Sequence, residues 1–207
     1  YTVDAYETSF GSWRIAYAHA DIYGGVLYVG TDSMLVFQNN GNLSFTQNTC
    51  TSQSSNMASV TNVSSSRVEL TSSCNARGGV LNCSGGSCDF YNNELIEFSG
   101  NSVTSTASMG GKISGTPIYA TVETDARIRG GVIALESATM SLFDNEDVIF
   151  RENTINATAV KQSTADSRTE LNMLTYGAAL YVDGESSFTL GGNHSVIFEK
   201  NLEINND

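Results

Sequence analysis

The chain has 207 residues, a mass of 22.1 kDa and a hydrophobic fraction of 40%, which together allow one sizeable folded domain. Ten Lys and Arg against 22 Asp and Glu give a net charge of −12, which excludes the basic surface that nucleic-acid binding needs. No stretch approaches the roughly 20 apolar residues of a membrane-spanning helix, so we expect no membrane insertion by this segment. Low charge, four cysteines and abundant Ser, Thr and Asn favour an extracellular or cell-surface protein.

Residues 1–21 precede the first repeated motif, and we expect them to form a lead-in or a partial coil. The chain begins with YTVDAYETSF, which has neither the basic nor the apolar segment of a secretory signal. We therefore expect this sequence to be a fragment of a longer chain.

Two short motifs alternate four times over residues 22–207, at 22–48, 76–101, 128–153 and 175–201. A glycine doublet followed by an aliphatic residue comes first, and a Phe-x-x-Asn motif follows it at a nearly constant distance in all four copies. The glycines are Gly24, Gly25, Gly78, Gly79, Gly130, Gly131 and Gly177, the last of which is followed by Ala. The second motif supplies Phe45, Phe98, Phe150 and Phe198, with Asn48, Asn101, Asn153 and Asn201. Motifs at such fixed spacing are typical of a repeat protein.

Around each Phe, large apolar residues alternate with polar ones and are interrupted by Asn, Gly and Asp turns. This pattern excludes helix and predicts short strands joined by tight turns. Because the distance from the glycines to the Asn is about half of the repeat, we expect two coils per repeat and an all-β, parallel β-helix of roughly eight coils. The Phe and Asn columns would stack as structural ladders, with the Asn at a corner and the glycines in the bends. The Ser/Thr-rich segments 49–77, 102–129 and 154–176 are expected to hold less regular coils and projecting loops.

The alternation of Gly-Gly-aliphatic and Phe-x-x-Asn motifs resembles the repeat of the chlamydial polymorphic outer-membrane proteins, whose signatures are GGA[ILV] and FxxN. Residues 22–201 carry the resemblance, with Val26, Val80 and Val132 in the place of the Ala and with Gly177-Ala178-Ala179-Leu180 as the fourth copy. The resemblance implies a right-handed parallel β-helix on a cell surface, commonly an adhesin passenger.

Four cysteines allow three disulfide pairings. The separation of Cys50 and Cys74 equals that of Gly24 and Asn48, one predicted coil length, whereas Cys83 and Cys88 enclose the short loop 84–87 with its two glycines. We therefore favour Cys50–Cys74 together with Cys83–Cys88. Cys88 also fits a buried hydrophobic position, because it shares a column with Leu35, Met140 and Phe188.

Asn-x-Ser/Thr sequons provide five candidate glycosylation sites, Asn42, Asn62, Asn82, Asn156 and Asn193. Their number is close to what composition alone gives. We expect Asn42 and Asn193 to lie in equivalent exposed turns, which makes them the first choices.

No pattern points to a catalytic residue, a metal site or a cofactor. Arg127 and Arg129 share a strand face with Glu123 and Asp125, which predicts a surface ladder of ion pairs. The acidic turn 144–147 is expected to be solvated rather than to bind Ca²⁺. The two histidines, His19 and His194, lie near opposite ends of the sequence, and no Ser has a His or Asp partner in its sequence context.

These observations favour a non-enzymatic extracellular repeat module of a cell surface, either adhesin-like or structural. Its expected partners are a protein or glycan on a surface, or neighbouring copies joined end to end. The alternative is a carbohydrate-active β-helix enzyme, a polysaccharide lyase or a glycoside hydrolase. That function would need a groove with clustered carboxylates and arginines.

Overall fold

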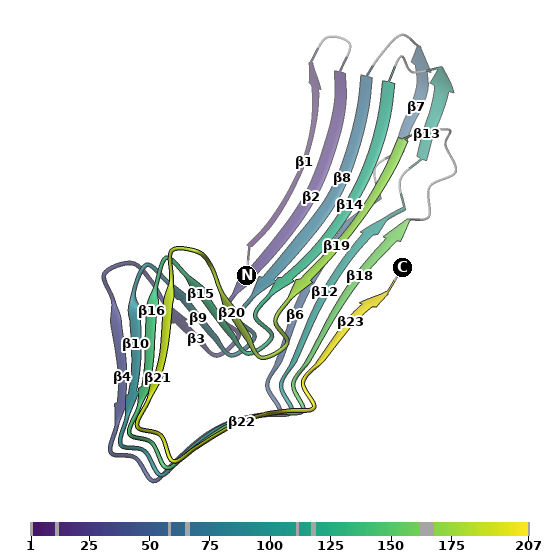
Figure 1. The fold of residues 1–207 in the computed structure, drawn as a ribbon. Helices are drawn as coiled ribbons and strands as arrows, with labels where there is room; N and C mark the ends of the chain where they lie inside the picture. Colours follow the sequence, from purple (N-terminus) through teal and green to yellow (C-terminus); the bar gives the residue numbers. More distant parts are fainter. Residues whose placement is uncertain are drawn as a thin grey trace.

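The computed structural model describes residues 2–10, 13–57, 59–64, 67–110, 112–116, 119–161 and 168–206. All regular structure in these ranges is β-strand, and the strands form a parallel β-helix (Figure 1). Among these residues, none belongs to a helix long and apolar enough to cross a membrane.

Four coils of the β-helix stack on one another, and each coil adds one strand to every main sheet. The first coil contains β2 (Trp13–Tyr23), β3 (Leu27–Val29), β4 (Met34–Gln38), β5 (Asn42–Thr46), β6 (Thr49–Asn56) and β7 (Ser59–Ser64). The second contains β8 (Arg67–Arg77), β9 (Leu81–Ser84), β10 (Ser87–Tyr91), β11 (Leu95–Ser99), β12 (Ser102–Met109) and β13 (Lys112–Thr116). The third contains β14 (Tyr119–Arg129), β15 (Ile133–Glu136), β16 (Thr139–Phe143), β17 (Asp147–Arg151) and β18 (Thr154–Lys161). The fourth contains β19 (Arg168–Tyr176), β20 (Leu180–Val182), β21 (Ser187–Gly191), β22 (Ser195–Glu199) and β23 (Leu202–Asn206).

Strand pairing makes each coil as long as a whole repeat. Phe98 pairs in register with Phe45 on one side and with Phe150 on the other, and Phe150 pairs with Phe198. The fold class that the sequence predicts is therefore confirmed. The stack has four long coils, however, rather than the roughly eight shorter ones that the motif spacing predicts. The difference arises because each inter-repeat segment is part of the same coil as the motifs beside it.

The two motifs of each coil enclose the main hydrophobic core, in the part of the molecule that we call the body. Three sheets surround this core, made by β3-β9-β15-β20, β4-β10-β16-β21 and β5-β11-β17-β22. Inside, the predicted Phe ladder is stacked, with ring centroids 5.0 Å apart between Phe45 and Phe98 and 4.5 Å apart between Phe150 and Phe198. Each stacked pair stabilises the fold by about 1 kcal/mol beyond the burial of apolar area.

The inter-repeat segments form an extended arm instead of the predicted loops (Figure 1). Sheet A (β2-β8-β14-β19, with β1, Thr2–Phe10, at its edge) and sheet E (β6-β12-β18-β23) pack together there. The arm's core contains small side chains, such as Ala20, Cys74, Ala107 and Ala157. Several of its buried hydroxyls bond to backbone or to each other, as Ser54 does with the carbonyl of Ala18 at 3.0 Å and with Ser72 at 2.8 Å. Alternation of small residues thus lets two sheets approach closely along the arm.

Asparagine side chains close two corners of every coil. The predicted column is confirmed as a chain of hydrogen bonds, since the Nδ2 of Asn48, Asn101 and Asn153 donates to the Oδ1 of the Asn in the next coil at 2.8–2.9 Å. A second column repeats this arrangement with Asn40, Asn93, Asn145 and Asn193. In both columns the residue before the Asn has positive φ, for example Gln47 at 56° and Asp144 at 53°. The left-handed residue is therefore the one before the asparagine.

Residues 13–23 belong to the first coil, where β2 pairs in parallel with β8. Ahead of it, β1 (Thr2–Phe10) pairs antiparallel with β2 and covers the free edge of sheet A (Figure 1). The segment expected to be a lead-in thus contains part of a coil and the strand that covers it.

Candidate functional site

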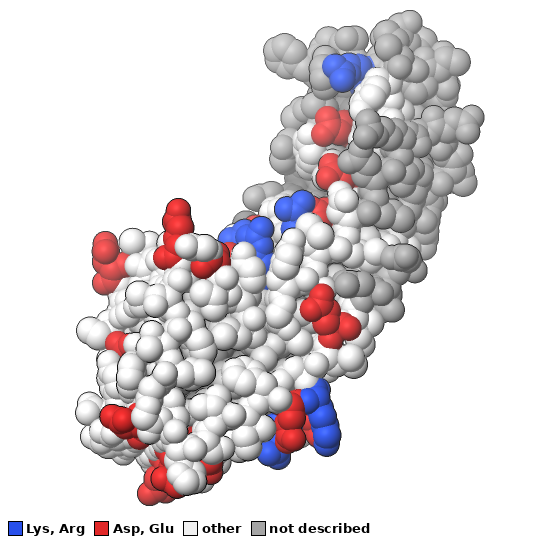
Figure 2. Space-filling model, viewed as in Figure 1, with Lys and Arg blue, Asp and Glu red and all other residues white. Residues whose placement is uncertain are grey.

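The outer surface of sheet A is the candidate site. Along β2, β8 and β14 the side chains of even-numbered residues are mostly buried, while those of odd-numbered residues face outward. The outward set, here called the polar face, combines aromatic, acidic, basic and amide side chains, namely Tyr17, His19, Asp21, Tyr23, Glu69, Ser73, Asn75, Arg77, Glu123, Asp125, Arg127 and Arg129. Figure 2 shows basic and acidic groups together where the arm meets the body.

A row of four residues crosses the polar face at the end nearest the body. Strand pairing aligns Tyr23 with Arg77, Arg77 with Arg129, and Arg129 with Tyr176. We call these four residues the Tyr–Arg row. Tyr23 and Tyr176 are exposed, by 41% and 44%. The row therefore presents two aromatic rings with two guanidinium groups between them.

The Tyr23 ring has a defined position in this row. The guanidinium of Arg77 lies 4.9 Å from its centroid, and Tyr28 meets it edge-on at 6.4 Å. Its hydroxyl donates to Asp21 at 3.4 Å. Partial burial raises the pKa of Tyr23, and the nearby Asp21 carboxylate raises it further, against the opposing effect of Arg77. Tyr23 is thus a neutral hydrogen-bonding ring with one exposed side.

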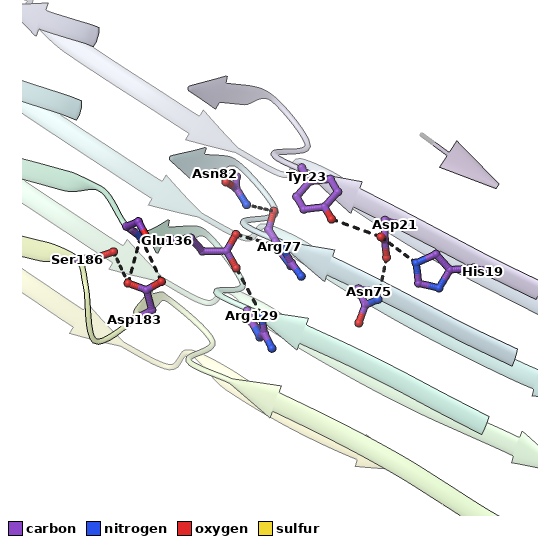
Figure 3. Close-up of polar contacts among 11 residues, drawn as sticks. His19, Asp21, Tyr23, Asn75, Arg77, Asn82, Arg129, Glu136, Asp183 and Ser186 are labelled. Carbon is purple, nitrogen blue, oxygen red and sulfur yellow. Dashed lines mark hydrogen bonds and ion pairs between the residues drawn. The ribbon is translucent and has the colours of Figure 1, made fainter. Parts of the chain in front are cut away.

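Glu136, at the end of β15, holds both arginines of the row (Figure 3). Its two carboxylate oxygens lie 3.3 Å from Arg77 Nη1 and 3.6 Å from Arg129 Nη1. The predicted ion-pair ladder is therefore confirmed in part. Arg127 pairs with Asp125 through Nη2 and Oδ2 at 2.6 Å, whereas Arg129 reaches Glu136 because the chain turns immediately after it.

His19 links two strands in a way that the sequence analysis missed. Its Nδ1 lies 3.1 Å from Ser73 Oγ. Its Nε2 lies 2.9 Å from Asp21 Oδ2, and the other oxygen of Asp21 accepts from Asn75 Nδ2 at 2.8 Å (Figure 3). His19 and Ser73 are separated by the same step as the first two glycine doublets, at Gly24 and Gly78. Applying that step to the whole chain would have found the contact.

This Ser–His–Asp chain is better suited to hold the polar face in place than to catalyse acyl transfer. β8 lies between β2 and β14, so its backbone N–H groups take part in the sheet and none of those around Ser73 forms an oxyanion hole. Both ring nitrogens of His19 are engaged by its neighbours. The chain therefore fixes the orientation of Asp21 beside the Tyr–Arg row.

Asp183 stabilises the turn next to Glu136 (Figure 3). It accepts from Ser186 Oγ at 2.6 Å and from the backbone N–H of Ser137 at 3.2 Å. The hydrogen bond from Ser186 lowers the pKa of Asp183, with further contributions from backbone N–H groups. Ser137 has a φ of 50°, so this carboxylate supports a left-handed residue in the corner.

All four cysteines are buried free thiols in the structure. The predicted Cys50–Cys74 disulfide is not formed: the two residues do not stack in one column, but lie in sheets E and A on opposite sides of the arm's core. Cys74 Sγ instead lies 2.9 Å from Ser105 Oγ, and Ser105 pairs in register with Ser52 on the strand of Cys50. The predicted Cys83–Cys88 bond is not formed either, although these two side chains are hydrogen-bonded to each other.

The sequons differ in their accessibility. Asn82 is fully buried, and Asn156 is half-buried. Asn193 is not equivalent to Asn42, because it belongs to the second asparagine column, where its Nδ2 donates to the carbonyl of Leu142 at 2.8 Å. Asn42 is exposed, which leaves its amide nitrogen open to modification. The side chain of Asn62 lies outside the described residues.

Within the described ranges, no group of three His, Cys, Asp or Glu side chains is placed to hold a metal ion. No family model, curated protein or solved structure matches the chain. The proposed function therefore rests on the fold and on the polar face.

Proposed function

We propose that this protein is a non-enzymatic, extracellular, adhesin-like module of a cell surface, and that it binds a protein or glycan partner through the polar face. The Tyr–Arg row carries this proposal. Exposed tyrosine rings offer flat apolar surfaces with little conformational freedom, and guanidinium groups donate several hydrogen bonds in a fixed plane. The repeat motifs, which resemble those of surface proteins, support the location.

The scaffold beneath the row is suited to recognition. Four paired strands set the spacing of the row, which spans about 14 Å at roughly 4.8 Å per strand. Glu136 and Asp21 hold the arginine and tyrosine side chains in place before any partner arrives. Little side-chain entropy is then lost on binding, which favours affinity.

Binding of the purified chain to a glycan array and to intact cells tests the proposal, with the double variant Tyr23→Ala/Tyr176→Ala as the probe. We expect at least a roughly tenfold loss of affinity, since truncating such aromatic groups typically costs more than about 1 kcal/mol. Tyr119→Ala is the matched control, because Tyr119 is an equally exposed ring on sheet A with Arg67 5.0 Å above it. Equal binding by all three proteins, or a loss confined to the Tyr119 variant, would contradict the proposal.

The cluster of Arg77, Arg129 and Glu136 beside Asp125 and Arg127 is the observation that favours the alternative, a carbohydrate-active enzyme. A glycosidase needs one carboxylic acid that stays protonated. Here both carboxylates are held by arginine side chains, Glu136 by Arg77 and Arg129 and Asp125 by Arg127. Incubation with polyuronides and neutral polysaccharides provides the test. Cleavage of a polysaccharide by the natural protein but not by Glu136→Gln would show that the enzymatic function, and not the recognition function, is correct.

The uncovered face of the last coil supports a structural contribution as well. It exposes Val196, Ile197 and 48% of Phe198, and an open hollow there is lined by residues including Leu180 and Phe198. A further coil of the same kind would cover these groups and continue the Phe column. We propose a neighbouring copy as the source of such a coil.

A further inference from the structure

The corner between β9 and β10 differs from the equivalent corners of the other coils. At its two inward positions the first coil has Val29 and Leu35, and the third has Leu135 and Met140. In the second coil the same two positions are occupied by Cys83 and Cys88, both fully buried in the main core. Apolar side chains without a thiol are therefore sufficient to fill this corner, and the second coil has two thiols there instead.

The chain between the two cysteines is suited to bring their sulfurs together. Only Gly85 and Gly86 separate the strands that end at Ser84 and begin at Ser87, and Gly85 has a φ of 73°. The two thiols are hydrogen-bonded to each other. The turn itself is half-buried at the surface, so opening this corner brings the buried sulfurs into contact with solvent.

We propose that Cys83 and Cys88 form a reversible dithiol–disulfide site whose oxidant is a small disulfide such as oxidised glutathione. The Cys83 thiolate attacks the S–S bond of the oxidant and releases one equivalent of thiol. The Cys88 thiolate then attacks the Cys83 sulfur of the mixed disulfide and releases the second. Two electrons and two protons leave the protein, and one S–S bond forms for the one that is broken.

The surroundings of the two thiols assign them these different roles. The hydrogen bond from Cys88 lowers the pKa of Cys83, whereas the same bond and burial raise the pKa of Cys88. The thiolate is the attacking species, so Cys83 reacts first. Burial raises the pKa of Cys50 and Cys74 as well, which disfavours their thiolates and makes them slower to react.

The test is equilibration of the folded protein with reduced and oxidised glutathione, followed by acid quenching, alkylation and peptide mass mapping. We expect a Cys83–Cys88 bond, seen as a mass loss of about 2 Da from the peptide that contains both, while Cys50 and Cys74 remain alkylatable. In Cys88→Ser, glutathione should remain attached to Cys83. In Cys83→Ser, we expect several-fold less glutathione on Cys88 than Cys83 carries in Cys88→Ser. The double variant Cys50→Ala/Cys74→Ala serves as the matched control and should oxidise like the natural chain.

Three results would overturn the proposal. The first is that both thiols persist at ratios of oxidised to reduced glutathione that oxidise the same chain in denaturant. The second is a disulfide between Cys50 and Cys74. The third is a mixed disulfide on Cys83 that accumulates in the natural chain without forming the Cys83–Cys88 bond. None of these results depends on whether the polar face binds a partner.

Discussion

At the scale of single residues, an asparagine recurs at two corners of each coil for one physical reason. A left-handed residue turns the strand, and the following Asn satisfies backbone groups that the turn leaves without partners. The first column follows directly from the Phe-x-x-Asn motif. The second could have been predicted as well, because Phe37-Gln38-Asn39-Asn40 and Phe90-Tyr91-Asn92-Asn93 are literal copies of that motif. Leu142 and Leu190 replace the Phe in the later coils and concealed the pattern.

Asn153 is a fully connected member of these columns, with hydrogen bonds to the coils on both sides. Its Nδ2 donates to the carbonyl of Phe98 and to Asn201, and its Oδ1 accepts from the backbone and side chain of Asn101. Asn153→Ala leaves buried groups without partners, and we expect the free energy of unfolding to fall by about 3 kcal/mol. Chemical denaturation of the two proteins measures this difference in the free energy of unfolding. Asn42→Ala, at an exposed position, is the control, and an equal effect of both substitutions would refute this role.

The buried thiol of Cys74 makes stability depend on pH at the alkaline end. Burial raises the pKa of Cys74 to about 11, so the folded protein keeps the thiol proton at pH values where the unfolded chain has lost it. The stabilisation is complete below about pH 8.5 and is lost as pH rises towards 11, by about 2 kcal/mol for this group.

Denaturation curves between about pH 8 and 11 measure this loss. Comparison with Cys74→Ala isolates it, because Ala20 and Ala126 occupy the same position in neighbouring coils and show that Ala fits. Parallel pH profiles for the two proteins would exclude the thiol as the source.

At the scale of elements, the motif-bearing strands could be predicted and the arm could not. Alternation of large apolar residues marks the strands around Phe45 and Phe98, because their side chains fill a wide core. The arm strands alternate Ser, Ala and Thr, as β12 does, and small polar residues are also typical of loops. Only burial between two close sheets distinguishes such a strand from a loop. That burial depends on which segments of the chain face each other in the fold.

The second glycine of each doublet lies against the backbone of the next coil. A Cβ on Gly131 would overlap the carbonyl oxygen of Ala178 and a methyl group of Ile155. Gly131→Ala should therefore destabilise the protein by about 2 kcal/mol or more, since backbone has to shift. Thermal unfolding checks this against Gly184→Ala, where a Cβ meets nothing within 4 Å. A normal melting temperature for the Gly131 variant would mean that the coils are further apart than described.

At the scale of the whole molecule, β1 covers an edge that would otherwise pair with other chains. It runs antiparallel to β2, so it does not continue the helical path of the coils. Free strand edges promote association between chains. Deleting residues 1–12 should therefore increase the concentration-dependent association of the protein, as measured by analytical ultracentrifugation. If the shortened protein associates no more than the original does, β1 has no such protective role.

The candidate site was only partly predictable from the sequence, and the coil length is the reason. Arg127 and Asp125 could be paired from their spacing on one strand, whereas the Tyr–Arg row and the contact of His19 with Ser73 join residues of different coils. They become visible only when the correct coil length is known. A coil half as long predicts other neighbours, including a Cys50–Cys74 disulfide that the structure does not contain.

The asparagine columns also give the stack a direction. In every described hydrogen bond from one asparagine to another, the donor belongs to the earlier coil and the acceptor to the later one. A chain that emerges amino-terminus first thus presents, on each finished coil, an amide and a backbone N–H that only the next coil can satisfy. We expect such a protein to fold from its amino-terminus towards its carboxyl terminus. Each folded coil would serve as the template for the next while the rest of the chain is still emerging.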